Sequence, residues 1–148
     1  MNKNKILLVE DNLLVSTAVN DILTDEGFLV AAAETGKDAV ELLKNGTFQL
    51  VLLDMVLPDT NGRKLLESWQ RKYPELPVVI MTAHGDIPTA VECLRAGAYD
   101  FLTKPVERPL LLKTIQNALS HAEALKKVDV LTQLSSREPD LIGMTEVI

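Results

Sequence analysis

The sequence predicts an α/β fold, a (βα)5 doubly wound arrangement in which five strands of one parallel sheet alternate with five helices. Three short, unbroken apolar runs carry this prediction, at residues 6–9, 49–53 and 78–81. Runs of this length, bounded by polar residues or Pro, are typical of strands that are buried on both faces. Helix-like segments lie between the runs, and this alternation predicts βαβ units with right-handed crossovers.

The remaining elements are weaker but fall in the expected order. Two further strands are expected at residues 28–32 and 100–102. Helices are expected at residues 13–26, 35–43, 63–72 and 87–96, and from Pro109 onward. Gly27 would stop the first helix, Thr35 would cap the second, and Pro109 suits a helix start, where its missing N–H costs little. The last helix is expected to be unusually long.

Composition and charge exclude several classes of protein. The 148-residue chain is long enough for one ordinary domain, and 47% hydrophobic with 24% charged residues is typical of a soluble globular protein. Its net charge of -6 argues against direct nucleic-acid binding, which needs clustered Lys and Arg. The single cysteine, Cys93, suits a reducing compartment. The apolar run after Lys5 is too short for a signal peptide or a membrane span. We expect a cytoplasmic protein without membrane contact.

Polar side chains stand where the predicted strands end. They are Glu10, Asp11, Asp54, Thr82, Thr103 and Lys104. In open parallel sheets, ligands bind beyond the carboxyl ends of the strands, near the point where the strand order reverses. The predicted fold therefore gathers three carboxylates, two hydroxyls and an amine in one place. Each residue taken alone is explained by helix capping or by a solvated charge, and only their coincidence indicates a site.

This combination is chemically complete for phosphoryl transfer. Clustered carboxylates repel one another unless a cation enters, and oxygen ligands that leave room for phosphate are what Mg²⁺ favours. An Asp carboxylate can attack phosphorus and form an aspartyl phosphate. A metal, a Lys and a hydroxyl can together neutralise the oxygens of the transferred group. Asp54 is the expected acceptor.

These residues resemble the receiver domain of two-component response regulators. The matching pieces are Ile6–Asn12, Leu52–Met55, Leu57–Pro58, Gly62, Val79–Ala83, Gly97–Ala98 and Phe101–Pro105. The resemblance covers about residues 4–122, so we expect a receiver domain at residues 1–122. It implies the flavodoxin-like strand order 2-1-3-4-5 and a cis peptide between Lys104 and Pro105.

The resemblance also implies roles for individual residues. Asp54 would accept the phosphoryl group, with Lys104 and Thr82 bound to the acyl phosphate. Mg²⁺ would be held by Asp11, Asp54 and the backbone carbonyl of Val56, with Glu10 helping directly or through water. Such a domain is not an enzyme and assists only its own Mg²⁺-dependent phosphorylation and dephosphorylation. An apolar Val56 should position attacking water poorly, which favours a long-lived phosphate.

Phe101 would act with Thr82 as a switch, filling space that Thr82 leaves on phosphorylation. Many relatives carry Tyr at the position of Phe101, so a switch based on packing alone is expected here; simple core packing is the alternative. Asp59 and Asn61 read as turn and helix-start residues.

The C-terminal part suggests a connection to a longer protein. The apolar positions Leu111, Ile115, Ala118, Ala122 and Leu125 follow spacings of four and three residues. This favours a helical linker at 123–139 with a coiled-coil dimer seam; an ordinary last helix packed on the sheet is the alternative. Residues 140–148 resemble the opening of the AAA+ domain in sigma-54-dependent activators. Residues 82–88 also resemble that subgroup, especially its nitrogen and dicarboxylate-transport regulators.

The leading interpretation is a switch that takes phosphate from a histidine kinase and regulates an attached sigma-54-dependent activator through dimer rearrangement. The AAA+ and DNA-binding domains of such an activator are absent from this chain. One alternative is a stand-alone receiver that binds a target protein through its fourth helix, fifth strand and fifth helix. A haloacid-dehalogenase-like phosphohydrolase is disfavoured, because such enzymes carry a second Asp where Val56 stands.

Overall fold

The computed structural model describes residues 4–135, with side chains described up to Lys126. The strands are β1 (Lys5–Val9), β2 (Leu29–Ala33), β3 (Leu50–Asp54), β4 (Val78–Thr82) and β5 (Asp100–Thr103). The helices are α1 (Leu13–Asp25), α2 (Gly36–Asn45), α3 (Gly62–Lys72), α4 (Ile87–Arg95) and α5 (Arg108–Ser135), with a 3₁₀ turn η1 (His84–Asp86) before α4. All paired strands are parallel, in the order β2-β1-β3-β4-β5. The predicted fold class and strand order are confirmed.

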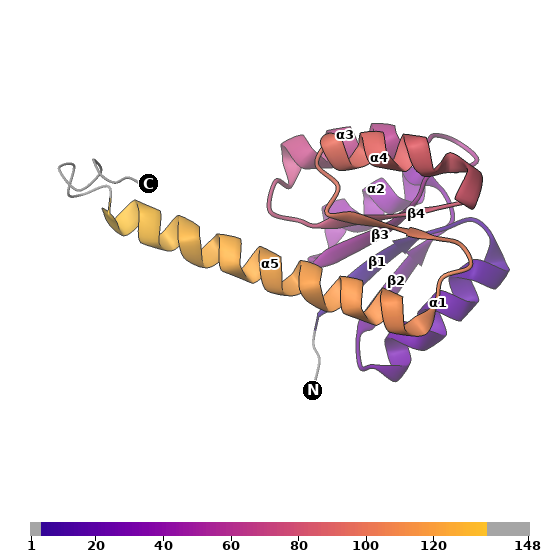
Figure 1. Ribbon diagram of the computed structural model, residues 1–148, viewed down its shortest axis with the longest axis horizontal. Coiled ribbons are helices and arrows are strands. Elements are labelled where there is room, and N and C mark those ends of the chain that lie inside the picture. The colour runs from indigo at the N-terminus through magenta and orange to yellow at the C-terminus, as the bar shows by residue number, and fades with distance from the viewer. Residues whose placement is uncertain (1–3, 136–148) are drawn as a thin grey trace.

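The helices form one layer on each face of the sheet (Figure 1). Helices α1 and α5 bury Leu23 and Ile115 against one face, together with alternate residues of the strands. Helices α2, α3 and α4 cover the other face, where Trp69 lies in the core. Within β1, Ile6 and Leu8 face the first cluster while Leu7 faces the second. The unbroken apolar runs therefore reflect strands that are buried on both sides.

The edge strand β2 explains the weakest part of the sequence pattern. It pairs only with β1 in the described sheet, and it begins at Leu29, one residue later than expected. Leu29 is 56% exposed, and Ala32 is also exposed. The sequence of β2, Leu29–Ala33, is apolar throughout, but three of its five residues are Ala, which is depleted in strands, so the run predicts a strand only weakly.

Most predicted helix boundaries are confirmed to within a few residues. Thr35 is the N-cap of α2, with its hydroxyl oxygen accepting the N–H of Asp38 at 3.0 Å. Gly27 follows α1 with φ +89°, a conformation that non-glycine residues rarely adopt. Helix α5 starts at Arg108, so Pro109 stands in its first turn as expected.

Helix α5 is packed on the sheet in its first half and continues beyond the sheet afterwards (Figure 1). Leu111, Ile115 and Ala118 are fully buried in the domain, whereas Leu125 is 45% exposed. The apolar stripe thus begins as domain core and ends at the surface. Residues 136–139 of the predicted linker and the predicted AAA+ opening at 140–148 lie outside the described residues. Across the described chain, no helix combines the length and the apolar character needed to cross a membrane.

Candidate functional site

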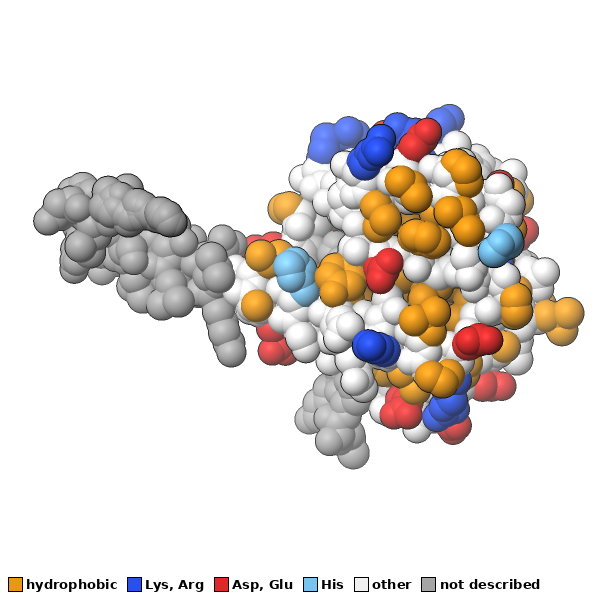
Figure 2. Space-filling view, viewed as in Figure 1, with side chains coloured by type: hydrophobic (Ala, Val, Ile, Leu, Met, Phe, Trp, Pro, Cys, Tyr) orange, Lys and Arg blue, Asp and Glu red, His pale blue; other side chains and the backbone are white. Residues whose placement is uncertain are grey.

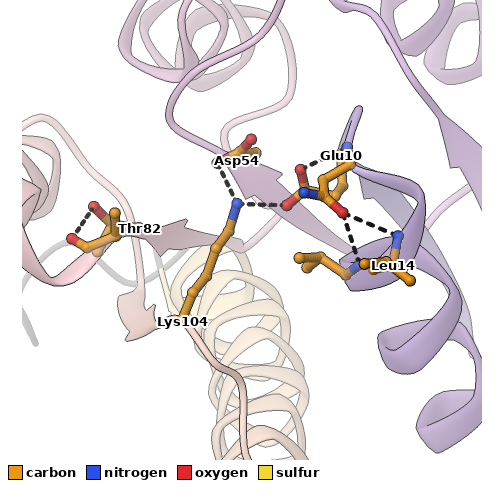
Figure 3. A network of polar contacts seen from close by, with 8 residues as sticks. Glu10, Leu14, Asp54, Thr82 and Lys104 are labelled. Atoms are coloured by element: carbon orange, nitrogen blue, oxygen red, sulfur yellow. Dashed lines mark hydrogen bonds and ion pairs between the residues drawn. The ribbon is translucent and has the colours of Figure 1, made fainter.

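The carboxyl edge of the sheet brings together residues from three strands (Figure 3). Asp54 is the last residue of β3, Glu10 directly follows β1, and Lys104 directly follows β5. Strands β1 and β3 are neighbours, so their ends lie side by side. Lys104 is held beside the end of β4, because its backbone N–H donates to the carbonyl of Thr82 at 2.8 Å. Its long side chain then reaches the two carboxylates.

Lys104 links the two buried carboxylates. Its Nζ lies 2.9 Å from Asp54 Oδ1 and 2.6 Å from Glu10 Oε1. The side chains of Glu10 and Asp54 are only 1% and 8% exposed, whereas that of Lys104 is 22% exposed. Charges so poorly hydrated need partners, and one ammonium here serves two carboxylates. The buried part of the site therefore carries an excess of negative charge.

The pKa shifts follow from this arrangement. Burial raises the pKa of Glu10; contact with Lys104 and the backbone N–H of Asn12 act against the rise, and the nearby charge of Asp54 adds to it. Burial opposes a charge on Lys104, but its two carboxylate partners outweigh that effect, so the pKa of Lys104 lies above its ordinary value. Both pKa values are expected to rise when two buried carboxylates share one ammonium group.

The carboxylates fit a divalent cation. One oxygen each from Glu10, Asp11 and Asp54 lies within 4.8 Å of the others. Glu10 Oε2 accepts the N–H of Asn12 at 3.1 Å, while Oε1 approaches Lys104 without hydrogen-bond alignment and is buried without a hydrogen-bond partner. Asp11 is exposed, so the cluster is open to solvent on one side. Hard oxygen donors with an open side suit Mg²⁺, which keeps several waters.

The loop after Asp54 is tightly folded. Val56 and Asn61 form an antiparallel bridge, and the N–H of Leu57 donates to the carbonyl of Thr60 at 3.2 Å. Gly62 closes the loop by donating to the carbonyl of Met55 at 2.8 Å. A Cβ on Gly62 would lie 2.7 Å from the carbonyl oxygen of Asp54, so only glycine permits this approach. The Val56 side chain points into solvent, at 65% exposure.

Asp59 contributes an interaction that the sequence did not reveal. Asn61 caps α3 as expected, accepting the N–H of Lys64 at 3.0 Å. Asp59, however, caps the distant helix α2: its Oδ1 and Oδ2 accept the N–H groups of Gly36 and Lys37 at 2.8 and 3.0 Å. These bonds lower the pKa of Asp59. The sequence predicts a turn at Asp59, but no neighbouring residue indicates that its partner lies 23 positions away.

The two switch candidates lie near the site but outside its ion-pair network. Thr82 ends β4 and is fully buried, and its hydroxyl donates to the carbonyl of Ala83 at 3.2 Å (Figure 3). Phe101 lies on β5, half-buried against the core cluster that α2, α3 and α4 cover. The cis peptide implied between Lys104 and Pro105 is present. The structure thus brings Glu10, Asp11, Asp54 and Lys104 together, whereas the Thr82 hydroxyl is bonded to the carbonyl of Ala83.

Fold and site together define a class of protein: a doubly wound parallel sheet with an acidic cluster, bridged by a lysine, at its carboxyl edge. Residues 6–116 match the response regulator receiver domain family, and the chain belongs to that family. The luminescence regulatory protein LuxO of Vibrio campbellii is 41% identical over 119 residues, covering 80% of this chain and 26% of that protein.

The similarity extends to a DNA-binding transcriptional regulator and to a solved structure. The DNA-binding transcriptional regulator NtrC of Proteus hauseri is 32% identical over 143 residues, covering 97% of this chain and 30% of that protein. A crystal structure of NtrX from Brucella abortus matches with a TM-score of 0.83 at 34% identity, covering 88% of this chain and 30% of that one. The chain thus spans between a quarter and a third of the length of these relatives.

Proposed function

We propose that the chain receives a phosphoryl group on Asp54 from a histidine kinase, with Mg²⁺, and thereby regulates an attached sigma-54-dependent transcription activator. The observation that carries this proposal is the carboxylate of Asp54 at the sheet edge, with Lys104 Nζ at 2.9 Å and a cation-binding set of acids beside it. Its family membership and its similarity to NtrC support the regulatory context. Such signalling takes place in the cytoplasm.

The residues divide the chemistry between them. An oxygen of Asp54 attacks phosphorus, the new O–P bond forms, and the bond from phosphorus to the kinase histidine breaks. Lys104 orients the Asp54 carboxylate beforehand and then neutralises charge on the transferred group. Glu10, Asp11, Asp54 and the Val56 carbonyl would hold Mg²⁺, which when bound supplies positive charge to the phosphoryl oxygens. The domain thus assists its own phosphorylation without acting on another substrate.

The switch is assigned to Thr82 and Phe101. In the present state the Thr82 hydroxyl donates to its neighbouring carbonyl, so it is available for an exchange of partners. A phosphoryl oxygen at Asp54 is a stronger, charged acceptor. If Thr82 turns toward it, Phe101 can move further into the core, since it is only partly buried. Phosphate shifts the equilibrium only by as much as it binds the active arrangement better.

The central claim is tested by phosphorylation of the protein itself. The full chain is incubated with Mg²⁺ and acetyl phosphate, and its intact mass is measured beside that of Asp54→Ala. We expect a single phosphoryl addition in the wild type and none in the variant, with labelling abolished by removal of Mg²⁺. No mass gain in the wild type, or equal labelling of Asp54→Ala, would show that the acceptor assignment is wrong.

We propose that the output passes through a homodimer formed by α5. Leu111, Ile115 and Ala118 are buried within the domain, so a seam between two copies must begin later, near Ala122 and Leu125. Light-scattering masses of the chain, with and without beryllofluoride, should show a dimer that Leu125→Glu weakens. A chain ending near Ser120 should be monomeric. Equal monomeric masses for all proteins in both states would exclude this seam.

One observation favours the alternative, a stand-alone receiver that binds a target protein. Figure 2 shows hydrophobic side chains gathered on the face where α4 lies, and Val91 of α4 is 38% exposed. Exposed apolar patches mark interaction sites. The two proposals differ in oligomeric state: the adaptor remains a monomer with or without phosphate, whereas the activator fragment forms dimers.

A further inference from the structure

The loop that follows Asp54 is fastened at both of its ends. Its base is closed by the Val56–Asn61 bridge and by the hydrogen bond from Gly62 to Met55. Its tip, residues 57–60, is bound to helix α2 through the side chain of Asp59. A loop held at base and tip has little freedom, so a change at either end alters the position of the backbone between them.

Helix α2 depends on this contact for its first N–H groups. The first turn of a helix has N–H donors without partners inside the helix. In α2 the N–H of Asp38 is satisfied by Thr35, and those of Gly36 and Lys37 are both satisfied by Asp59. Asp59 is therefore a second cap, supplied from another part of the chain, and its negative charge suits the positive end of the helix dipole.

The packing under this contact is close. A Cβ on Gly36 would clash with Cγ2 of Thr60, so the loop tip rests directly on the start of α2. Asp59 stands three residues beyond Val56, whose carbonyl is the proposed backbone ligand of Mg²⁺. The distance along the chain from cap to ligand is short, and the bridge from Val56 to Asn61 couples the backbone of Val56 to the strand that returns from the loop tip.

We propose that Asp59 is a positioning residue for the metal site, holding the Val56 carbonyl in place by capping helix α2. The inference rests on the proposed function, because the reaction at Asp54 is what requires the metal. If so, the start of α2, 18 residues before Asp54 in sequence, helps to hold the Val56 carbonyl in place through Asp59. Loss of the cap should weaken Mg²⁺ binding while leaving the carboxylate ligands intact.

The obvious competing explanation is that Asp59 only stabilises α2. Two control variants separate the explanations. Thr35→Ala removes the other cap of the same helix without touching the loop. Asp38→Asn removes a carboxylate from the same first turn and changes the net charge by the same amount as Asp59→Asn. Asp59→Asn keeps the shape of the side chain but turns an amide NH₂ toward one of the two N–H donors.

The test is calorimetric titration of each 148-residue chain with Mg²⁺ alone, beside urea unfolding followed through Trp69. We expect Asp59→Asn to weaken Mg²⁺ binding by about threefold to tenfold, below the largest losses seen for residues that orient metal ligands. Asp38→Asn and Thr35→Ala should bind Mg²⁺ as the wild type does, although Thr35→Ala should unfold at lower urea.

The outcomes separate this inference from the proposed function. Wild-type affinity in Asp59→Asn, or an equal loss in Thr35→Ala or Asp38→Asn, overturns the positioning role while the acceptor assignment stands. Absence of Mg²⁺ binding in the wild type overturns both. If Asp59→Asn is too unstable to titrate at 25 °C, the titration is made at lower temperature with Asp59→Glu, whose longer carboxylate should also misplace the loop.

Discussion

Replacing Lys104 by Met tests the charge balance of the site directly. Met keeps an unbranched apolar stem but removes the ammonium that lies 2.6 Å from Glu10 Oε1 and 2.9 Å from Asp54 Oδ1. Removing one partner of a buried ion pair typically costs about 3–5 kcal/mol, because the remaining charge is left uncompensated. Lys104 is 22% exposed, so solvent screens part of the interaction. We therefore expect a loss of about 2–3 kcal/mol in the free energy of unfolding.

The measurement is urea unfolding at neutral pH, with and without Mg²⁺. Because a cation among the carboxylates can replace the missing charge, Mg²⁺ should stabilise Lys104→Met more than it stabilises the wild type. Asp54→Asn should behave in the opposite way: it removes one of two carboxylates that compete for Lys104, so it should be at least as stable as the wild type and respond less to Mg²⁺. Lys113→Met, an exposed site on α5, is the control. A Lys104→Met protein as stable as this control, or one indifferent to Mg²⁺, would refute the reasoning.

Three further predictions concern the surroundings of the site. Gly62→Ala places a Cβ 2.7 Å from the backbone oxygen of Asp54, so unfolding should become easier by about 1–3 kcal/mol in urea, and an unchanged midpoint would contradict the close approach. Cys93 is fully buried and burial raises the pKa of its thiol, so it should not react with a disulfide reagent at pH 8 until urea unfolds the chain; rapid reaction of the folded protein would disprove this. The lowered pKa of Asp59 means that its cap stabilises the fold fully above the ordinary Asp pKa of about 3.9 and is lost as pH falls through the lower folded-state pKa. Stability measured from pH 5 down to pH 2 should therefore fall less steeply in Asp59→Asn, and parallel curves for both proteins would exclude the effect.

The fold was predictable where buried strands require unbroken apolar runs in the sequence. Residues 6–9 are completely buried between two helix layers, and only apolar side chains suit both faces. The edge strand β2 left a weaker mark, because three of its five residues are Ala, which is depleted in strands. The meeting of Glu10, Asp54 and Lys104 followed from topology alone, since parallel strands end at one edge of the sheet.

Other parts of the site depend on contacts that no local pattern records. The bond between Asp59 and the start of α2 joins segments 23 residues apart, and an Asp in a turn looks the same whether it caps its own helix or another. The Thr82 hydroxyl donates to the carbonyl of Ala83, and a rotatable hydroxyl takes whichever acceptor the fold brings near it, so sequence places the residue but not its hydrogen bond. Sequence therefore indicates which carboxylates meet at the sheet edge better than it indicates the contacts that hold the surrounding loop in place.

Helix α5 shows why one pattern can predict two structures. Spacings of four and three residues suit a helix packed on a sheet as well as a helix packed on its copy, because both require one apolar stripe. The stripe serves the domain core as far as Ala118, and at Leu125 it is 45% exposed. In the proposed dimer the same rigid helix therefore belongs to the core and to the seam. If phosphorylation changes how Ile115 packs in the core, the dimer contact near Leu125 would move with it, because both residues lie on α5.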